Sequence, residues 1–243
     1  MEIVIECLEA HASSFSQSSR ASRLREPRLM LIKGRKTLVA LSLFGAYDGL
    51  INVAEVDSRL EEAELWFELC QLMRIPIFQI TSCLYPIDPI RITPEVTTIT
   101  ANIKRLDLLT QKYYLQVGYE ASAWGTHLNT WQQIHEIITL VDLPNVRYCL
   151  DTFHVSAKEA GDPFSAVAPV RPGGLTNLRR PLDEMKRTIT PNQIAYFQLS
   201  DESQVDYPRH DLNQPPYMTE SRNCRIFPCE ANRGGVLPVL EVT

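Results

Sequence analysis

The sequence predicts an α/β fold in which strands and helices alternate along the chain and the strands form a parallel sheet. Short runs rich in β-branched residues alternate with longer segments of helical period. The short runs are almost continuously apolar, which is typical of parallel strands buried on both faces. The length of 243 residues allows one or two domains, because an α/β barrel of about 250 residues forms a single domain.

Six runs are predicted to be strands because they are rich in β-branched or aromatic residues and end near turn or helix-start signals. In chain order they are Glu2 to Cys7, Thr37 to Leu43, Pro76 to Thr81, Tyr114 to Tyr119, Arg147 to Asp151 and Ile194 to Leu199. In such folds the loops and helix N-termini open at the carboxyl ends of the strands. We therefore expect any chemistry at that edge of the sheet.

Helices are predicted between the strands, and several have recognisable start signals. Ser58 with Glu61 fits a capping box, and Thr93 fits an N-cap that is followed by a proline. Thr130 with Gln133 fits a further capping box. After it, apolar residues repeat at helical spacing and predict one stripe that packs on the sheet, made of Trp131, Ile134, Ile138 and Val141.

Two segments carry no clear element. The segment from Ser13 to Lys36 is rich in serine at its start, and Pro27 interrupts the helix that its remainder could form. The segment from Glu202 to Gly235 holds several prolines and a glycine pair, so it is predicted to be a long loop. Loops of this length in compact domains are usually functional or disordered.

Composition excludes several classes of function. The formal net charge is −5, which argues against a nucleic-acid binder that uses a broad basic face. No uncharged apolar run is long enough to span a membrane, so no membrane partner is expected. The six cysteines include no CxxC pair, and the first residues are acidic where a secretory signal would be basic. We expect a reduced, cytoplasmic protein.

Three successive predicted strands finish with an oxygen-bearing side chain: Glu120, Asp151 and Gln198. Two carboxylates and an amide carbonyl that meet at one edge repel one another or stay unsatisfied unless a cation lies between them. An all-oxygen donor set favours Mg²⁺, Mn²⁺ or a similar ion over a thiolate zinc site. The alternative is that the two acids cap helices or pair with arginines.

His154 follows Asp151 on the same connection and has the pKa range suited to taking up or donating a proton. The alternative, and the commoner role for a loop histidine, is a surface residue or a hydrogen-bond donor, but the neighbouring Asp151 favours the catalytic interpretation. His135 falls inside a predicted helix and is interpreted as structural, and His127 lies in the loop beside the predicted site.

The long loop carries Arg222 and Arg225, whose spacing suits the binding of an anionic group such as a carboxylate or a phosphate. The alternative is a solvated loop whose arginines pair with nearby acids. Cys224 and Cys229 have no second cysteine pair near them, so a zinc site is not expected there.

The sequence resembles the xylose isomerase-like sugar phosphate isomerase/epimerase superfamily, and within it the fungal and bacterial 3-dehydroshikimate dehydratases. The resemblance covers about the whole chain, is strongest from Glu120 onward and is poor from Ser13 to Lys36. The segments that carry it include Tyr119-Glu120-Ala121, Trp124-Gly125-Thr126-His127, Leu150-Asp151-Thr152-Phe153-His154, Phe197-Gln198-Leu199-Ser200-Asp201 and Ser221-Arg222-Asn223-Cys224-Arg225.

The resemblance implies a TIM barrel, here one domain over residues 1–243, with a divalent cation such as Mg²⁺, Mn²⁺ or Co²⁺ at its mouth. It implies a carbon–oxygen lyase that dehydrates 3-dehydroshikimate to protocatechuate in quinate and shikimate catabolism. Metal ligands would be Glu120, Asp151 and Gln198, with Glu120 counted in the catalytic centre, and His154 would be the acid/base group. Ser221 and Arg225 would bind the small carboxylate substrate.

The chain departs from the family pattern in the number of strands. A closed barrel has eight strands and six are predicted, so the first and last βα units are expected to be missing, together with a glutamate that is the fourth metal ligand. We therefore expect weaker metal binding and impaired activity. The open edges are also compatible with pairing to another copy of the chain. Two alternatives stay open: a sugar-phosphate isomerase or epimerase, and a non-catalytic remnant of the family.

Overall fold

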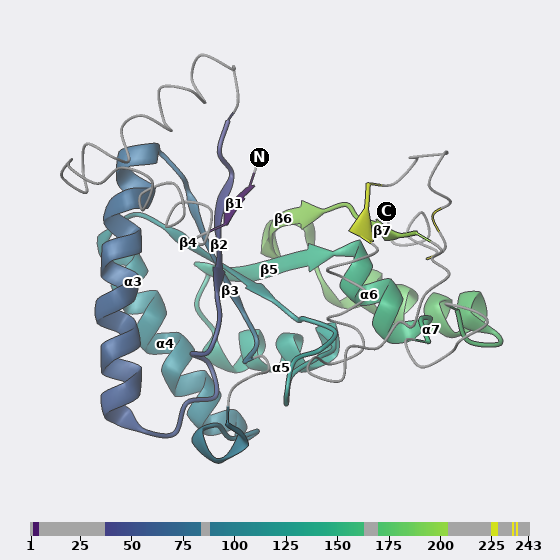
Figure 1. Cartoon of the computed structure of the whole chain (residues 1–243), viewed down its shortest axis with the longest axis horizontal. Helices are drawn as coiled ribbons and strands as arrows, with labels where there is room; N and C mark the ends of the chain where they lie inside the picture. The colour runs from purple at the N-terminus through teal and green to yellow at the C-terminus, as the bar shows by residue number, and fades with distance from the viewer. Residues whose placement is uncertain are drawn as a thin grey trace.

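The computed structural model describes residues 2–4, 37–83, 88–162, 170–203, 225–227, 235 and 237. These residues form a six-stranded parallel sheet in which the strand order follows the chain order. Figure 1 shows the sheet curling, with the helices outside it. The strands are β1 (Glu2–Val4), β2 (Ala40–Phe44), β3 (Ile77–Thr81), β4 (Gln116–Glu120), β5 (Val146–Asp151) and β6 (Ile194–Gln198). The predicted α/β fold of about six barrel-like strands is confirmed for the described residues.

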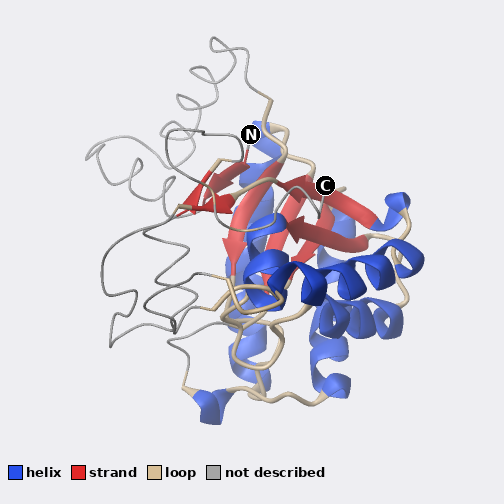
Figure 2. Cartoon of the chain, turned by 90° about the vertical axis from the view of Figure 1, so that its right-hand side faces the viewer, coloured by secondary structure: helices blue, strands red, loops and turns tan. Residues whose placement is uncertain are grey.

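In the part of the chain that the structure describes, five helices lie outside the curled sheet. Figure 2 shows this arrangement from a second direction. All but the last of them pack against neighbouring strands, and the last packs against the helix before it. The connections are those of repeated βα units. None of the described helices has the length and apolar character needed to cross a bilayer. The helices are α3 (Val53–Met73), α4 (Val96–Lys112), α5 (Trp131–Val141), α6 (Thr152–Glu159) and α7 (Gly174–Thr188), with short 3-10 turns η1 (Pro89–Arg91) and η2 (Pro191–Gln193).

The core lies between this helical layer and the sheet. Phe67 of α3 meets Phe78 of β3 edge-on, with ring centroids 4.7 Å apart, a geometry that aromatic pairs favour. The apolar stripe predicted for α5 is confirmed, since Trp131, Ile134, Ile138 and Val141 are all buried. Burial of this stripe holds α5 on the sheet and thereby fixes the loop that precedes it.

The fourth strand differs from its predicted range. Tyr114 adopts a positive φ of 56° and is exposed, so the chain turns there and β4 begins only at Gln116. A left-handed backbone cannot continue a pleated strand. The strand also extends beyond the predicted end, to Glu120. Glu120 is therefore held by the sheet rather than by a loop.

One predicted helix start is wrong and another is shifted. Ser58 lies inside α3, which begins at Val53 and is capped by Asn52, whose side chain accepts from the Ala54 N–H. The Ser58–Glu61 spacing arose within a continuing helix. Thr93 does accept the N–H of Glu95, but α4 begins at Val96. The capping box of Thr130 and Gln133 is confirmed at α5.

The predicted loop after the sixth strand contains a short antiparallel pair, which corrects that prediction for the residues concerned. Strand β7 (Asp201–Glu202) pairs with β8 (Arg225–Ile226). This pairing returns the chain to the carboxyl end of β5 and β6. Residues 13–36 and most of the predicted loop lie outside the described residues.

Candidate active site

Two carboxylates stand at the carboxyl ends of neighbouring parallel strands. Glu120 is the last residue of β4 and Asp151 the last of β5, and both are buried. Together with His154 they form a cluster in which one donor atom from each residue lies within 4.8 Å of the others. The sheet therefore brings together the two acids and the histidine that the sequence predicted to share a site.

Asp151 is fixed because β5 passes directly into α6 and the aspartate caps that helix. Its Oδ1 accepts the backbone N–H of Phe153 and the hydroxyl of Ser200, both at 2.8 Å. Aspartate is a preferred residue at this position of a helix. With Oδ1 occupied in this way, Oδ2 is turned toward the cluster, where Arg225 Nη1 donates to it at 2.8 Å.

His154 lies one helical turn after Asp151, which points its ring back to the same edge of the sheet. Its Nε2 is 3.6 Å from Glu120 Oε1 and 3.8 Å from Asp151 Oδ2. Its Nδ1 accepts the backbone N–H of Ala123 at 3.1 Å. A neutral ring that accepts at Nδ1 carries its proton on Nε2.

Burial keeps the His154 ring neutral. It lowers the pKa of His154 to about 3, an effect that the Arg225 cation reinforces and that the Asp151 carboxylate opposes. Trp124 covers the ring in an edge-on contact with centroids 4.6 Å apart, which helps to exclude water. The histidine therefore faces the two carboxylates as a neutral donor.

Arg225 reaches this cluster from β8. Besides its bond to Asp151, its Nη2 lies 3.4 Å from His154 Nε2, and its guanidinium stacks on the Phe153 ring at 4.5 Å. Its Nε is buried and has no hydrogen-bond partner among the described residues. The sequence predicted a substrate contact for this arginine, and the structure puts its cation directly beside Asp151 and His154.

The structure describes some of the remaining predicted site residues but not others. Gln198 ends β6 opposite Asp151 in register, and its Oε1 accepts from Cys149 Sγ at 3.2 Å. Ser221 and Arg222 lie outside the described residues. His135 contacts the Tyr148 hydroxyl away from the cluster, which agrees with its structural interpretation.

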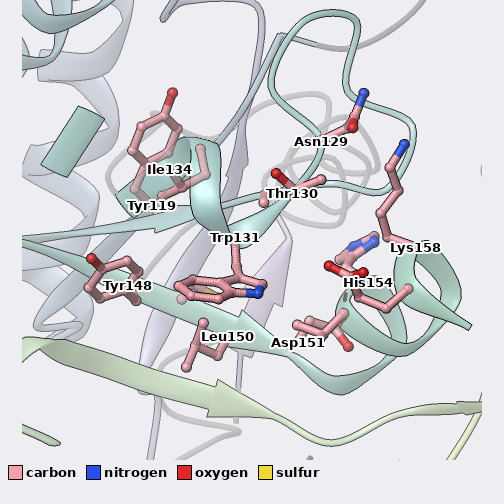
Figure 3. Close-up of a pocket in the computed structure, with 14 residues that line it drawn as sticks. Tyr119, Asn129, Thr130, Trp131, Ile134, Tyr148, Leu150, Asp151, His154 and Lys158 are labelled. Atoms are coloured by element: carbon pink, nitrogen blue, oxygen red, sulfur yellow. Dashed lines mark ion pairs between the residues drawn. The ribbon is translucent and has the colours of Figure 1, made fainter. Parts of the chain in front are cut away.

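A small cavity borders the cluster on the helix side of β5. Figure 3 shows Asp151 and His154 at one end of it and Tyr148 at the other, with Trp131 between them. Lys158 of α6 also lines it, and burial lowers the pKa of this lysine. The lining of the cavity combines apolar side chains with polar and charged ones, so Asp151 and His154 border both kinds of group.

The donor set suits a hard divalent cation. Glu120 and Asp151 offer buried carboxylate oxygens on one side of the cluster, and the second lone pair of Gln198 Oε1 is compatible with a further contact. His154 Nε2 is less suited to binding a cation, because the contact from Ala123 leaves the proton on this nitrogen. The acids therefore fit the role of ligands and the histidine that of a proton-exchanging group.

A family model described as a xylose isomerase-like TIM barrel matches residues 5–218 of the chain. The chain belongs to this family.

Among xylose isomerase-like proteins, similarity extends to a curated relative and to solved structures. The chain is 30% identical over 213 residues to a 3-dehydroshikimate dehydratase of Neurospora crassa, covering 84% of this chain and 58% of that protein. The zinc-bound IolI protein has a TM-score of 0.66 at 14% identity, covering 100% of this chain and 74% of that one. The probable 3-DHS dehydratase AsbF of Bacillus anthracis has a TM-score of 0.56 at 15% identity, covering 96% and 72%.

The similarity to solved structures and the similarity to the Neurospora dehydratase support different conclusions. The structural matches are below a quarter in sequence identity and establish the fold alone. The chain spans little more than half the length of the Neurospora dehydratase.

One polar residue of the candidate site was not predicted from the sequence. Gln79 of β3 is fully buried, and its Nε2 donates to Glu120 Oε2 at 2.8 Å. It sits two residues before the end of a strand whose other residues are mostly apolar. A polar side chain inside a buried parallel strand was the available signal, since such a group must find a partner.

Proposed function

We propose that this chain carries the catalytic centre of a 3-dehydroshikimate dehydratase, a lyase that converts its substrate to protocatechuate with a divalent cation. The observation that carries the proposal is the convergence of Glu120, Asp151 and His154 at the strand ends. Similarity to the Neurospora dehydratase supports the choice of substrate.

Glu120, Asp151 and Gln198 would hold the cation, which their hard oxygens favour as Mg²⁺, Mn²⁺ or Co²⁺. When bound, such an ion polarises a ketone oxygen and stabilises negative charge on it. The protein keeps Asp151 in place through its bonds to Phe153 and Ser200. Glu120 is held by the end of β4.

His154 would exchange a proton with the substrate at Nε2. Dehydration removes a proton from carbon and releases a neighbouring hydroxyl as water, so one group that accepts and returns a proton suffices. To accept a proton, Nε2 must present its lone pair, which requires the tautomer with hydrogen on Nδ1. That tautomer gives up the hydrogen bond from Ala123, which is the cost of activating the ring.

Arg225 would bind the substrate carboxylate, with Ser221 and Arg222 as further contacts. The guanidinium is already oriented by Asp151 and by the Phe153 ring. Its buried Nε, which has no partner among the described residues, can donate to an anion. An arginine is favoured over a lysine for this task because its planar fork matches a carboxylate.

The test is an assay of the purified chain with 3-dehydroshikimate and Mn²⁺, followed by the ultraviolet absorbance of protocatechuate. We expect product formation that stops when the cation is removed with a chelator. Product from a sugar phosphate but not from 3-dehydroshikimate would replace the proposal with isomerase or epimerase chemistry. No turnover and no cation retention would identify a non-catalytic family member.

A further inference from the structure

Gln79 joins Glu120 to Tyr196 across the inside of the curled sheet. Its Nε2 donates to Glu120 Oε2 at 2.8 Å, and its Oε1 accepts the hydroxyl hydrogen of Tyr196. The three residues belong to β3, β4 and β6, so the chain of bonds spans strands that are not all neighbours. Burying an amide costs free energy unless its polar atoms are paired, and here both ends are paired.

The direction of these two hydrogen bonds follows from the chemistry of the groups that they join. An ionised carboxylate has no hydrogen to donate, so the amide nitrogen must face Glu120 and the amide oxygen must face Tyr196. Each bond also polarises the next, because the hydroxyl draws charge toward Oε1 and strengthens the N–H donor at the other end. Tyr196 therefore acts on Glu120 through Gln79.

Gly118 of β4 lies beside this connection. A Cβ built at this position would lie 3.5 Å from Cε1 of Tyr196 and 3.2 Å from Cγ2 of Ile77. Gly118 is also the register partner of Gln79. The contact with Ile77 is the tight one, while the Tyr196 ring packs at ordinary van der Waals distance beside the glycine on the way from β6 to β3.

These hydrogen bonds give the two carboxylate oxygens of Glu120 different surroundings. Gln79 occupies Oε2, while Oε1 is the oxygen that lies 3.6 Å from His154 Nε2. Rotation of the carboxylate would break the bond to Gln79, so Oε1 is kept facing the cluster.

Resting on the proposed function, we infer that Gln79 is a positioning residue, which with Tyr196 presents a single oxygen of Glu120 to the cation. Partners that orient a ligating carboxylate are worth about 10–100-fold in metal affinity. A role confined to stability would instead lower the unfolding temperature and leave the affinity of the folded protein for the cation unchanged.

The experiment measures Mn²⁺ affinity by calorimetric titration without substrate, and the melting temperature of the metal-free protein. Gln79→Leu keeps the size of the side chain and removes both bonds, and we expect it to weaken Mn²⁺ binding about 10-fold or more. Gln116→Leu is the matched control, because Gln116 starts β4 at the opposite end from Glu120. It should leave Mn²⁺ affinity unchanged.

Tyr196→Phe removes only the hydroxyl and should weaken Mn²⁺ binding, but by a smaller factor than Gln79→Leu does. Combined with Gln79→Leu it should add nothing further, since the tyrosine acts through the glutamine. Mn²⁺ affinity of Gln79→Leu within about twofold of wild type would overturn the inference. If that variant does not fold, Tyr196→Phe is the deciding variant. An unchanged Mn²⁺ affinity of Tyr196→Phe would also overturn the inference.

Failure of the inference is distinct from failure of the proposed function. Wild-type protein that binds Mn²⁺ but forms no protocatechuate refutes the dehydratase, while the affinity series still supports or overturns the role of Gln79. Conversely, turnover by wild type together with unaltered Mn²⁺ affinity in Gln79→Leu removes only the positioning role.

Discussion

Arg225 donates through Nη1 to Oδ2 of Asp151 at 2.8 Å, although 74 residues separate them in the chain. The aspartate side chain is fully buried and that of the arginine is about one-third exposed, at 30%. Asp151 also caps α6 through its other oxygen. A single carboxylate thus serves a helix end, an ion pair and the proposed cation site, so its removal should affect stability and binding together.

Asp151→Ala should abolish Mn²⁺ binding and also destabilise the fold. Loss of the cap alone costs about 1 kcal/mol, and the arginine loses its partner in addition. Asp151→Asn keeps an oxygen for the Phe153 N–H and should preserve more stability while still binding Mn²⁺ poorly. Urea unfolding and calorimetric titration measure the two effects. Tight Mn²⁺ binding by either variant would exclude Asp151 as a ligand.

His154→Ala should retain Mn²⁺ and lose turnover. The ring carries its proton on Nε2 because Ala123 donates to Nδ1, so it contributes little to holding the cation. Loss of a general acid/base group typically reduces turnover by about 10²–10⁴-fold. Steady-state rates and Mn²⁺ titration on the same preparation separate the two properties. Substantial turnover in this variant would show that the proton-transfer role is assigned to the wrong residue.

Asp48 should make the stability of the folded protein depend on pH, and replacing it by asparagine should remove that dependence. Burial raises the pKa of Asp48 above its usual value, against hydrogen bonds from Cys83, Tyr119 and Gly49 that lower it. The folded protein therefore holds the Asp48 proton more tightly than the unfolded chain does. The stabilisation is complete below pH about 3.8 and is lost as the pH rises through the raised value.

Comparison of wild type with Asp48→Asn isolates this effect. The asparagine stays neutral, so between pH 7 and pH 4 wild type should gain stability relative to the variant. Urea unfolding at several pH values measures the difference. A constant difference across that range would mean that Asp48 does not titrate within it.

Thr130→Ala should destabilise the protein by about 1 kcal/mol, because it removes the hydroxyl of the α5 capping box. Ser58→Ala is the matched control, since the sequence suggests a capping box there and the structure puts Ser58 inside α3. At an interior helical position alanine is favoured over serine, so this variant should be neutral or slightly stabilising. Equal losses in thermal or urea unfolding would contradict the observed start of α3.

The sequence predicted which acids lie at the strand ends better than it predicted element boundaries. Strand-end acids are readable because they interrupt long apolar runs, and Glu120 and Asp151 lie at the ends of β4 and β5. Helix starts were less readable, since the Ser58 pattern occurs by chance inside α3 while Asn52 caps it. The start of β4 was missed because the left-handed backbone at Tyr114 has no clear signal in a non-glycine residue.

The sequence by itself determined the repeated strand–helix units, the parallel sheet and the acids at its carboxyl edge, because these follow from local hydrophobic pattern and strand direction. Only the tertiary structure decided that Arg225 pairs with Asp151 and that Gln79 links Tyr196 to Glu120. These contacts join residues distant in the chain, and nothing in a local pattern specifies which polar groups meet when a sheet curls. The register and curvature of the strands settle that choice.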